Sequence, residues 1–157
     1  MSLARNFRRN LAAAALLASG LALAGGDSIV CPAGTKKVGG PDSGLMATTC
    51  AKPDGTMHGP YLAYDAEGRL TARGRVVNGF RDGTFTFYDA RGNKTGETQF
   101  TRGNYDGKRV EYFANGQVRR EESYVKGNRE GTFRTFSEDG KLMSQAEFKG
   151  DRQVASR

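Results

Sequence analysis

Glycine recurs every 24 residues from Gly59 onward, and this period constrains the fold more than any other feature of the chain. Three glycine phases repeat, and an aromatic residue follows each first-phase glycine by five positions. A fixed period of this length marks a repeat architecture, in which each unit buries its apolar face only against its neighbours. The phases are Gly59, Gly83, Gly107 and Gly131; Gly68, Gly92, Gly116 and Gly140; and Gly79, Gly103 and Gly127, with Gly150 one residue early.

Each unit has the pattern of a β-hairpin followed by a tight return. In the unit at residues 107–130, two turn sequences, Ala114-Asn115-Gly116 and Lys126-Gly127-Asn128, separate short runs rich in Val, Tyr and Phe, and there is no proline. No apolar stripe of helical spacing occurs after residue 24. The sequence predicts an all-β, elongated antiparallel β-meander of about four 24-residue hairpin repeats over residues 59–157.

The second-phase glycine fixes the expected hairpin loop. Only this glycine is invariant in the four turns, which favours a three-residue loop with a type I turn and glycine in the left-handed region. Such a loop pairs each aromatic with the residue six positions later, and strict alternation places a third residue on the same face. The predicted core is Tyr64, Leu70, Val76; Tyr88, Lys94, Phe100; Tyr112, Val118, Tyr124; and Phe136, Leu142, Phe148.

The opposite face is expected to be less regular. Tyr61, Phe85 and Phe133 lie two residues after the first-phase glycine, whereas the third unit has Arg109 there. Either the sheet twists enough to cover these rings, or they form an exposed binding strip. Because nearly every other distinctive residue serves stacking, a specific function is expected in the non-repeating remainder, which includes Arg109 and Lys94, or along a basic rim.

Residues 1–24 have the pattern of a secretory signal peptide. Arg5, Arg8 and Arg9 precede an uncharged apolar run, and residues 22–24, Ala-Leu-Ala, form a small-x-small cleavage site. The alternative is a retained anchor, but the run is shorter than the roughly 20 residues that a spanning helix needs. The sequence predicts an exported protein, periplasmic or extracellular, that begins at Gly25 and has no transmembrane segment after cleavage.

Residues 25–58 are expected to form an N-terminal cap. Gly44 and Gly55 lie one period before Gly68 and Gly79, which indicates a degenerate repeat. Cys31 and Cys50 are the only cysteines, and in an oxidising compartment a disulfide is the default. The closed loop would contribute about 3 kcal/mol. A metal or redox pair is the alternative, with a single histidine at position 58 available.

Charge gives one functional hint. The formal net charge is +7, and three of the 24 basic residues lie in the signal, which leaves 21 against 17 acidic residues, or +4. This mixed surface does not favour nucleic acid. The turns between units place basic residues at one rim, and the hairpin tips place acidic residues at the other. Either these are solvated turns, or the basic rim binds an anionic polymer, lipid head groups or an acidic partner. The rim residues are Arg81, Arg102, Lys126, Arg129 and Arg152 against Asp65, Glu67, Asp89, Glu138 and Asp139, with Arg91 among the acidic tips.

Catalytic chemistry is not indicated. The lone histidine has no Ser or Cys partner in a nucleophile motif, and neither a phosphate-binding loop nor metal-ligand spacing occurs. Adjacent acids such as Glu121-Glu122 point to opposite faces of a strand. The sequence therefore predicts no catalytic residues, no metal and no cofactor.

Three motifs carry a family resemblance that spans residues 56–150. Residues 83–88 (GTFTFY), 115–116 (NG) and 126–131 (KGNREG) resemble the MORN repeat variant family, whose members are often labelled YwqK-type toxin–antitoxin antitoxins. The resemblance implies an elongated β-meander and a non-enzymatic interaction role. The family often has Trp two residues after the first glycine, and this chain has none.

Three functions remain open at the level of sequence. The first is a protein-binding or scaffold module, with another protein as partner. The second is an envelope-associated binder of anionic lipid or glycan through the basic rim, and the third is an antitoxin or immunity protein.

Overall fold

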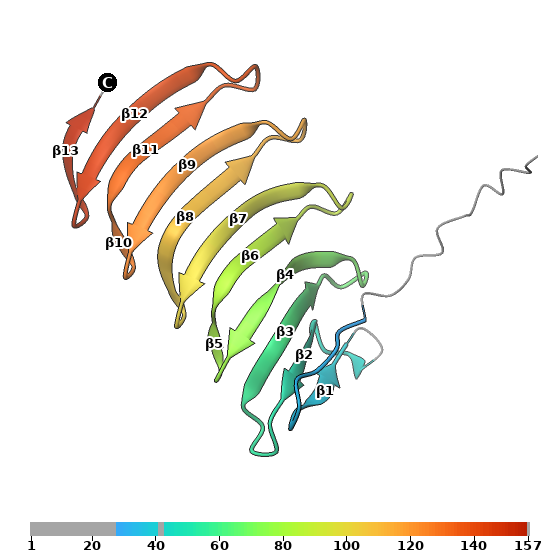
Figure 1. Ribbon diagram of the computed structural model, residues 1–157. Coiled ribbons are helices and arrows are strands. Elements are labelled where there is room, and N and C mark those ends of the chain that lie inside the picture. Colours follow the sequence, from blue (N-terminus) through green and yellow to red (C-terminus); the bar gives the residue numbers. More distant parts are fainter. Residues whose placement is uncertain (1–27, 41–42, 157) are drawn as a thin grey trace, which may run out of the picture.

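The protein is one open antiparallel sheet. A computed structural model describes residues 28–40 and 43–156, so the predicted signal at residues 1–24 lies outside the described residues. Thirteen strands follow one another in a meander, and the described part contains no α-helix and hence no helix able to cross a membrane. Figure 1 shows the strands stacked side by side along one axis, from the cap to the C-terminal strand. The prediction of an elongated all-β meander is confirmed.

Each repeat contributes two long strands, as the 24-residue period predicted. In two repeats a two-residue strand, β5 or β10, precedes the first long strand; in the third repeat one strand, β8, replaces both. The strands are β1 (Lys36–Gly39), β2 (Ala47–Ala51), β3 (Met57–Tyr64), β4 (Leu70–Val77), β5 (Phe80–Arg81), β6 (Gly83–Tyr88), β7 (Lys94–Thr101), β8 (Asn104–Tyr112), β9 (Val118–Val125), β10 (Asn128–Arg129), β11 (Gly131–Phe136), β12 (Leu142–Lys149) and β13 (Arg152–Ser156).

The hairpin within each repeat closes through the predicted three-residue loop. In the first repeat the amide of Asp65 donates to the carbonyl of Arg69, at 2.9 Å, and Gly68 has a φ of 78°. The corresponding glycines of the other repeats have φ of 82° or 83°. Each aromatic pairs with the residue six positions later, for example Tyr64 with Leu70. Glycine is needed here because a side chain in this left-handed region is strained.

The turns between repeats are two-residue turns of type I′, with positive φ at both central residues. Asn78 and Gly79 have φ of 52° and 84°, and Arg102 and Lys126 occupy the equivalent of Asn78. In the last turn the order is reversed, with Gly150 at 55° and Asp151 at 66°. The register is unchanged, because residues 149 and 152 still pair. Gly150 falls one residue early in the period because the glycine takes the first central position of this turn, and not the second.

Along one rim, each turn is also bonded to a strand residue of the hairpin before it. The amide of Gly79 donates to the carbonyl of Met57 at 2.8 Å, and Gly103 donates to Arg81 at 2.9 Å. Gly127 and Asp151 repeat the contact at 2.7 and 3.0 Å, with acceptors one repeat earlier. Each turn therefore satisfies its own backbone donor on its neighbour, which ties adjacent hairpins together beyond their strand pairing.

One expectation about the core is wrong. A β-bulge in the second strand of each hairpin leaves Thr71, Thr95, Arg119 or Met143 unpaired, just after the predicted loop. One extra residue reverses the alternation of faces from that point on. Each predicted triplet is therefore divided between the two faces. Val76, Phe100, Tyr124 and Phe148 lie on one face, and Tyr64, Leu70, Tyr88, Lys94, Tyr112, Val118, Phe136 and Leu142 lie on the other.

The true core is an aromatic ladder on the first of these faces, which we call the ladder face. Neighbouring ring centroids lie 4.6 to 5.9 Å apart, mostly in tilted or edge-to-face geometry. Phe85 is the most buried of its residues, at 1% exposed, whereas Leu142 on the other face is 48% exposed. The rings of Tyr61, Phe85 and Phe133 are thus covered by their neighbours. The ladder runs Tyr61, Phe85, Phe100, Tyr105, Tyr124, Phe133, Phe148.

Glycine gives the rings their space. First-phase glycines stand directly opposite ladder residues, as Gly83 does to Phe100 and Gly131 to Phe148. The closest approach of a glycine to a ring is at Gly74, which pairs with Tyr61; a Cβ there would lie 2.6 Å from atoms of the Phe85 ring. A single sheet has no second layer, so the Phe85 ring fills the space above a glycine of its own sheet.

The cap continues the sheet and carries the predicted disulfide. β1 pairs with β2 and β2 with β3, so the degenerate repeat is an extra hairpin at the end of the meander. Cys31 is bonded to Cys50, which is fully buried, and Pro32 and Cys50 both lie close to Gly59 of the first full repeat. The bond therefore holds the first described residues against the repeat that follows.

We expect Gly74→Ala to lower the free energy of unfolding by about 2 kcal/mol, through overpacking against Phe85. Gly74 has an ordinary φ, so backbone strain is not the cause. In a Phe85→Leu background the same change should cost less than half as much, because the ring that it meets is gone. Urea denaturation of the four proteins of this cycle measures the coupling. Equal costs in both backgrounds would contradict the packing argument.

We expect the double change Cys31→Ala/Cys50→Ala to lower the free energy of unfolding by about 3 kcal/mol, from lost loop constraint. Urea denaturation without reductant checks the value. As a control, the unchanged protein in strong reductant should approach the stability of the variant. If the two oxidised proteins were equally stable, the cap would be held by packing alone.

Candidate functional site

The ladder is interrupted once, in the third repeat. Arg109 occupies the position that is Tyr61, Phe85 and Phe133 in the other repeats. Opposite it on β9 stands Glu122, whereas Phe85 faces Thr98 and Phe133 faces Ala146. The third repeat thus replaces a ring and a small residue by an arginine and a carboxylate, in the middle of the packed face.

Arg109 holds two carboxylates at once. Its Nη1 donates to Oε2 of Glu122 and its Nη2 to Oε1 of Glu111, each at 2.5 Å. Glu122 has the least exposed side chain of the group, at 12%, and it also accepts from the hydroxyl of Tyr124 at 3.2 Å. Nη1 of Arg120 lies 3.6 Å from its other oxygen. These partners satisfy a charge that the ladder would otherwise leave buried and unpaired.

The pKa values of the group reflect this pairing. Partial burial lowers the pKa of Arg109, but the hydrogen bond and charge of Glu122, with those of Glu111, outweigh it and raise the pKa above the ordinary value. Burial, followed by the charge of Glu122, raises the pKa of the Tyr124 hydroxyl. Both shifts favour the protonated forms, so Arg109 stays charged and the Tyr124 hydroxyl keeps its proton.

Two hollows flank this cluster on the ladder face. The first, of about 450 Å³, is lined by residues of β6 to β9 that include Phe87, Tyr105 and Arg109. The second, of about 220 Å³, lies over β9 to β12 and includes Phe133 and Phe148. One cross-strand row joins them and forms their shared floor, which we call the groove row: Phe87, Gly96, Glu111, Arg120, Thr135, Ser144.

The five cations of the predicted basic rim do not share one environment. The guanidinium of Arg81 lies 5.4 Å from the centroids of Phe85 and Phe100, and that of Arg129 lies 4.4 Å from the Phe148 centroid. Arg129 also pairs with Asp151 at 3.3 Å. Two of the five rim cations thus cover the ladder. Arg102, Lys126 and Arg152 are exposed, the first two within type I′ turns and the third at the start of β13.

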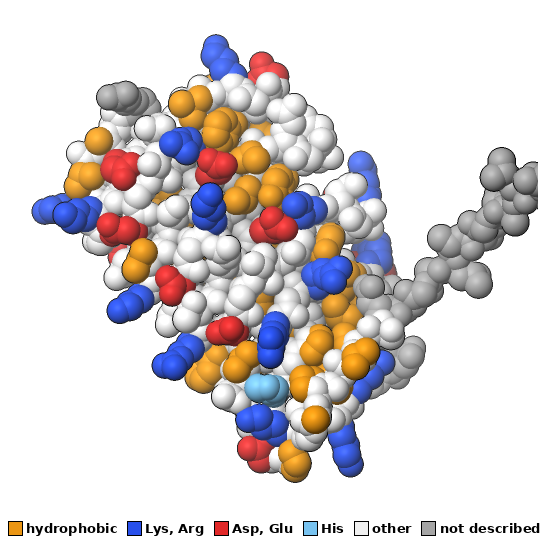
Figure 2. Space-filling model, in the orientation of Figure 1, with side chains coloured by type: hydrophobic (Ala, Val, Ile, Leu, Met, Phe, Trp, Pro, Cys, Tyr) orange, Lys and Arg blue, Asp and Glu red, His pale blue; other side chains and the backbone are white. Residues whose placement is uncertain are grey.

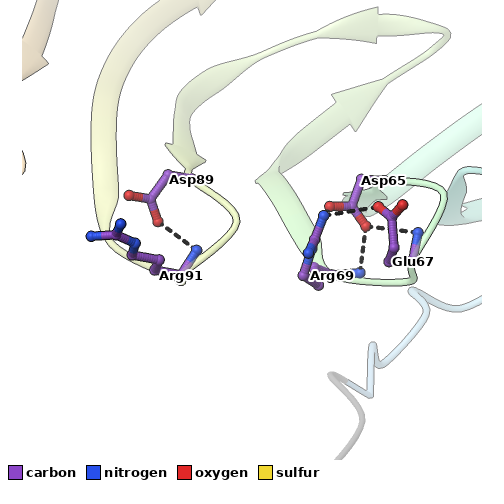
Figure 3. Close-up of polar contacts among 5 residues, drawn as sticks. All are labelled: Asp65, Glu67, Arg69, Asp89 and Arg91. Carbon is purple, nitrogen blue, oxygen red and sulfur yellow. Dashed lines mark hydrogen bonds and ion pairs between the residues drawn. The ribbon is translucent and has the colours of Figure 1, made fainter.

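The acidic tips at the other rim are engaged in their own loops (Figure 3). Oδ1 of Asp65 accepts from the amides of Glu67 and Arg69 at 3.1 and 2.9 Å, and Arg69 also pairs with both acids. Oδ1 of Asp89 accepts from the amides of Arg91 and Asn93. The side chain and amide of Asn93 lower the pKa of Asp89. Asp65 and Asp89 therefore serve first to close their own loops, through hydrogen bonds of the Asx-turn type.

The other non-repeating residues lie on the second face or at the cap. Lys94 stacks on Tyr112, with Nζ 4.4 Å from the ring centroid, and pairs with Glu97. His58 contacts Asn78, which also accepts from Lys52 at 2.6 Å. No group of three or more potential ligands for a metal ion occurs in the part of the chain that the structure describes. Figure 2 shows basic and acidic side chains interspersed over the face that it views.

The repeat pattern identifies Arg109 but not its surroundings. Arg109 departs from the repeat, but strict alternation places the ladder rings on a secondary face. Glu111, Glu122 and Arg120 were missed because their common face follows only from the bulged register. A comparison of repeats holds the signal. Where the second and fourth repeats have Thr98 and Ala146, the third has Glu122, opposite Arg109.

Comparison with known proteins agrees with the repeat architecture. Residues 105–126 and 129–149 match the family described as MORN repeat variant. These are the third and fourth repeats, one on each side of the turn at Lys126 and Gly127, and the first of them contains the Arg109 cluster. No curated protein matches the chain. The first two repeats share the hairpin and turn geometry of the two matched ones.

The cluster should be neutral or unfavourable for stability, because well-packed apolar residues often replace such pairs without loss. We expect the double change Arg109→Phe/Glu122→Thr, which copies the second repeat, to leave the free energy of unfolding unchanged or to raise it by about 1 kcal/mol. Arg109→Ala alone should lower it by about 2 kcal/mol, since Glu122 then loses its main partner. Urea denaturation of the three proteins checks the order. A double variant far less stable than the single one would mean that the pair is structural.

Proposed function

Starting from the MORN-variant repeats of its C-terminal half, we propose that this protein is a non-enzymatic module that seats a protein partner on the ladder face, at the Arg109 cluster. The observation that carries the proposal is the departure itself. The first, second and fourth repeats have an aromatic ring at the position of Arg109. The third repeat has the charged pair of Arg109 and Glu122 there. Local rules of a fold are broken most often where function requires it.

The cluster has the character of a recognition surface. Half-buried charges contribute more to specificity than to stability, because a partner must match them to avoid a desolvation penalty. The hollows beside it have walls of Phe87, Tyr105 and Phe133, and aromatic residues and arginine are the types enriched in protein interfaces. The surface thus combines apolar contact area with fixed charges.

The shape favours a macromolecule over a small ligand. Small-molecule sites usually enclose most of the ligand in a concave pocket. The two hollows are shallow and lie on one row of an open sheet, which suits an extended surface. We place the protein outside the cytoplasm, as the sequence predicts, and the buried bond between Cys31 and Cys50 supports this location.

The alternative of anionic lipid or glycan at the basic rim has less support. Arg81 and Arg129 lie over ladder rings, and Arg129 is paired with Asp151. Arg102 and Lys126, in separate turns, and Arg152, at the start of β13, are exposed to solvent. Exposed single charges of this kind contribute little without a concentrated field.

Affinity capture from the native envelope fraction tests the proposal. The baits are the full-length protein, its Arg109→Phe/Glu122→Thr variant and an Arg102→Gln/Lys126→Gln variant, each with the disulfide intact. We expect a partner protein to be retained by the first and third and lost by the second, because only the second removes the cluster. Retention by the cluster variant with loss in the rim variant would reject the ladder face and favour the rim.

A further inference from the structure

The charge balance of the two hollows points to the chemistry of what they bind. We propose that the ladder face receives an extended acidic peptide segment, laid across the strands along the groove row. This inference rests on the function proposed above and names its partner class. It adds a direction, a length and a charge that the proposed function does not require.

The hollows are basic as a pair. Together their linings contain five arginines against two glutamates, Glu111 and Glu122. Both glutamates are already committed to Arg109, at 2.5 Å each. Arg109 and Arg120 together balance these two carboxylates. Arg129 is paired with Asp151 and Arg134 with Glu121, so the unmatched charge that a partner meets is the positive charge of Arg119. The arginines are Arg109, Arg119, Arg120, Arg129 and Arg134.

Two of these arginines are available to a ligand. Arg119 is the bulged residue of β9, is exposed, and has no carboxylate within 4 Å among the described residues. Arg120 next to it belongs to the groove row, and its side chain is 42% exposed and only loosely paired, at 3.6 Å from Glu122. Arg119 lines the first hollow and Arg120 the second, so both border the groove row, whereas regular pleating would direct them to opposite faces. Two adjacent guanidinium groups suit carboxylates, which they bind in bidentate fashion.

The dimensions fit a short extended segment. The hollows extend from β6 to β12, six strands that are neighbours in the sheet. Five spacings of about 4.8 Å give about 24 Å, which an extended chain covers with about seven residues at 3.3 Å each. The walls formed by Phe87, Tyr105 and Phe133 provide apolar contacts between the charged positions. A peptide that alternates acidic and apolar residues therefore matches both the arginines and the aromatic walls.

Fluorescence anisotropy with two labelled octapeptides tests the inference. One alternates Asp and Leu, and the other alternates Lys and Leu. We expect the intact protein to bind the acidic peptide at least about tenfold more tightly, and raising the ionic strength from about 0.02 to 0.3 M to weaken that binding by screening. Similar affinities, preference for the basic peptide, or no binding of the acidic peptide would overturn the inference.

Matched variants locate the binding. Arg119→Gln/Arg120→Gln should weaken the acidic peptide by about tenfold, which corresponds to 1.4 kcal/mol. Arg73→Gln/Arg75→Gln removes the same charge from exposed positions on the second face and should change affinity less than about twofold. Arg119→Gln alone removes no side-chain hydrogen bond or ion pair among the described residues and keeps the test valid if the double variant is unstable. Equal losses in both double variants would show a general charge effect and overturn the inference.

The capture experiment separates failure of this inference from failure of the proposed function. If the native partner is lost with Arg109→Phe/Glu122→Thr but acidic peptides do not bind, the ladder face is the interface and the acidic class is wrong. If capture is indifferent to that variant, the proposed function itself fails.

Discussion

The packing of aromatic rings against one another is the interaction on which this structure depends. A single sheet has no opposing layer, so any apolar residue that it buries must be covered by residues of the same sheet. Phe85 reaches 1% exposure because it lies over Gly74, between the rings of Tyr61 and Phe100 and under the guanidinium of Arg81. Glycine therefore has two functions in this sheet. The periodic glycines adopt positive φ, and Gly74, which lies outside the period, leaves room for a ring.

The two kinds of turn make this packing repeat without drift. A three-residue loop closes one end of each hairpin and a two-residue type I′ turn closes the other, so each repeat advances by the same step. The bulge beside the three-residue loop adds one residue to the second strand and increases the local twist. Bonds from each turn to a strand residue of the hairpin before it hold the hairpins in line. Because the backbone geometry of the repeats is so regular, one repeat differs from another mainly through substitutions on the ladder face.

Arg109 is the clearest such substitution, and it is compatible with the fold because its partners were changed with it. Glu122 replaces the small residue opposite Arg109 and also accepts a hydrogen bond from the hydroxyl of Tyr124. Glu111 adds a second acceptor for Arg109. The result is a polar site set within an aromatic surface, with arginines at its margins. Such a site can discriminate between partners, since an uncharged or mismatched segment would leave buried charges without solvent.

The sequence by itself determined the local geometry of this protein. The glycine phases predicted the three-residue loops and the pairing of Tyr64 with Leu70, and the cysteine pair predicted the bond that closes the cap, because turn chemistry and redox chemistry depend on a few neighbouring residues. It could not determine which residues share a face. A single bulge at Thr71 and its equivalents reverses the alternation for the rest of each strand, and no residue type marks a bulge, since Thr, Arg and Met all occupy it. Only the tertiary structure brought Phe85, Phe100 and Phe148 onto one face and surrounded Arg109 with its glutamates, because facing partners are set by register across strands and not by distance along the chain.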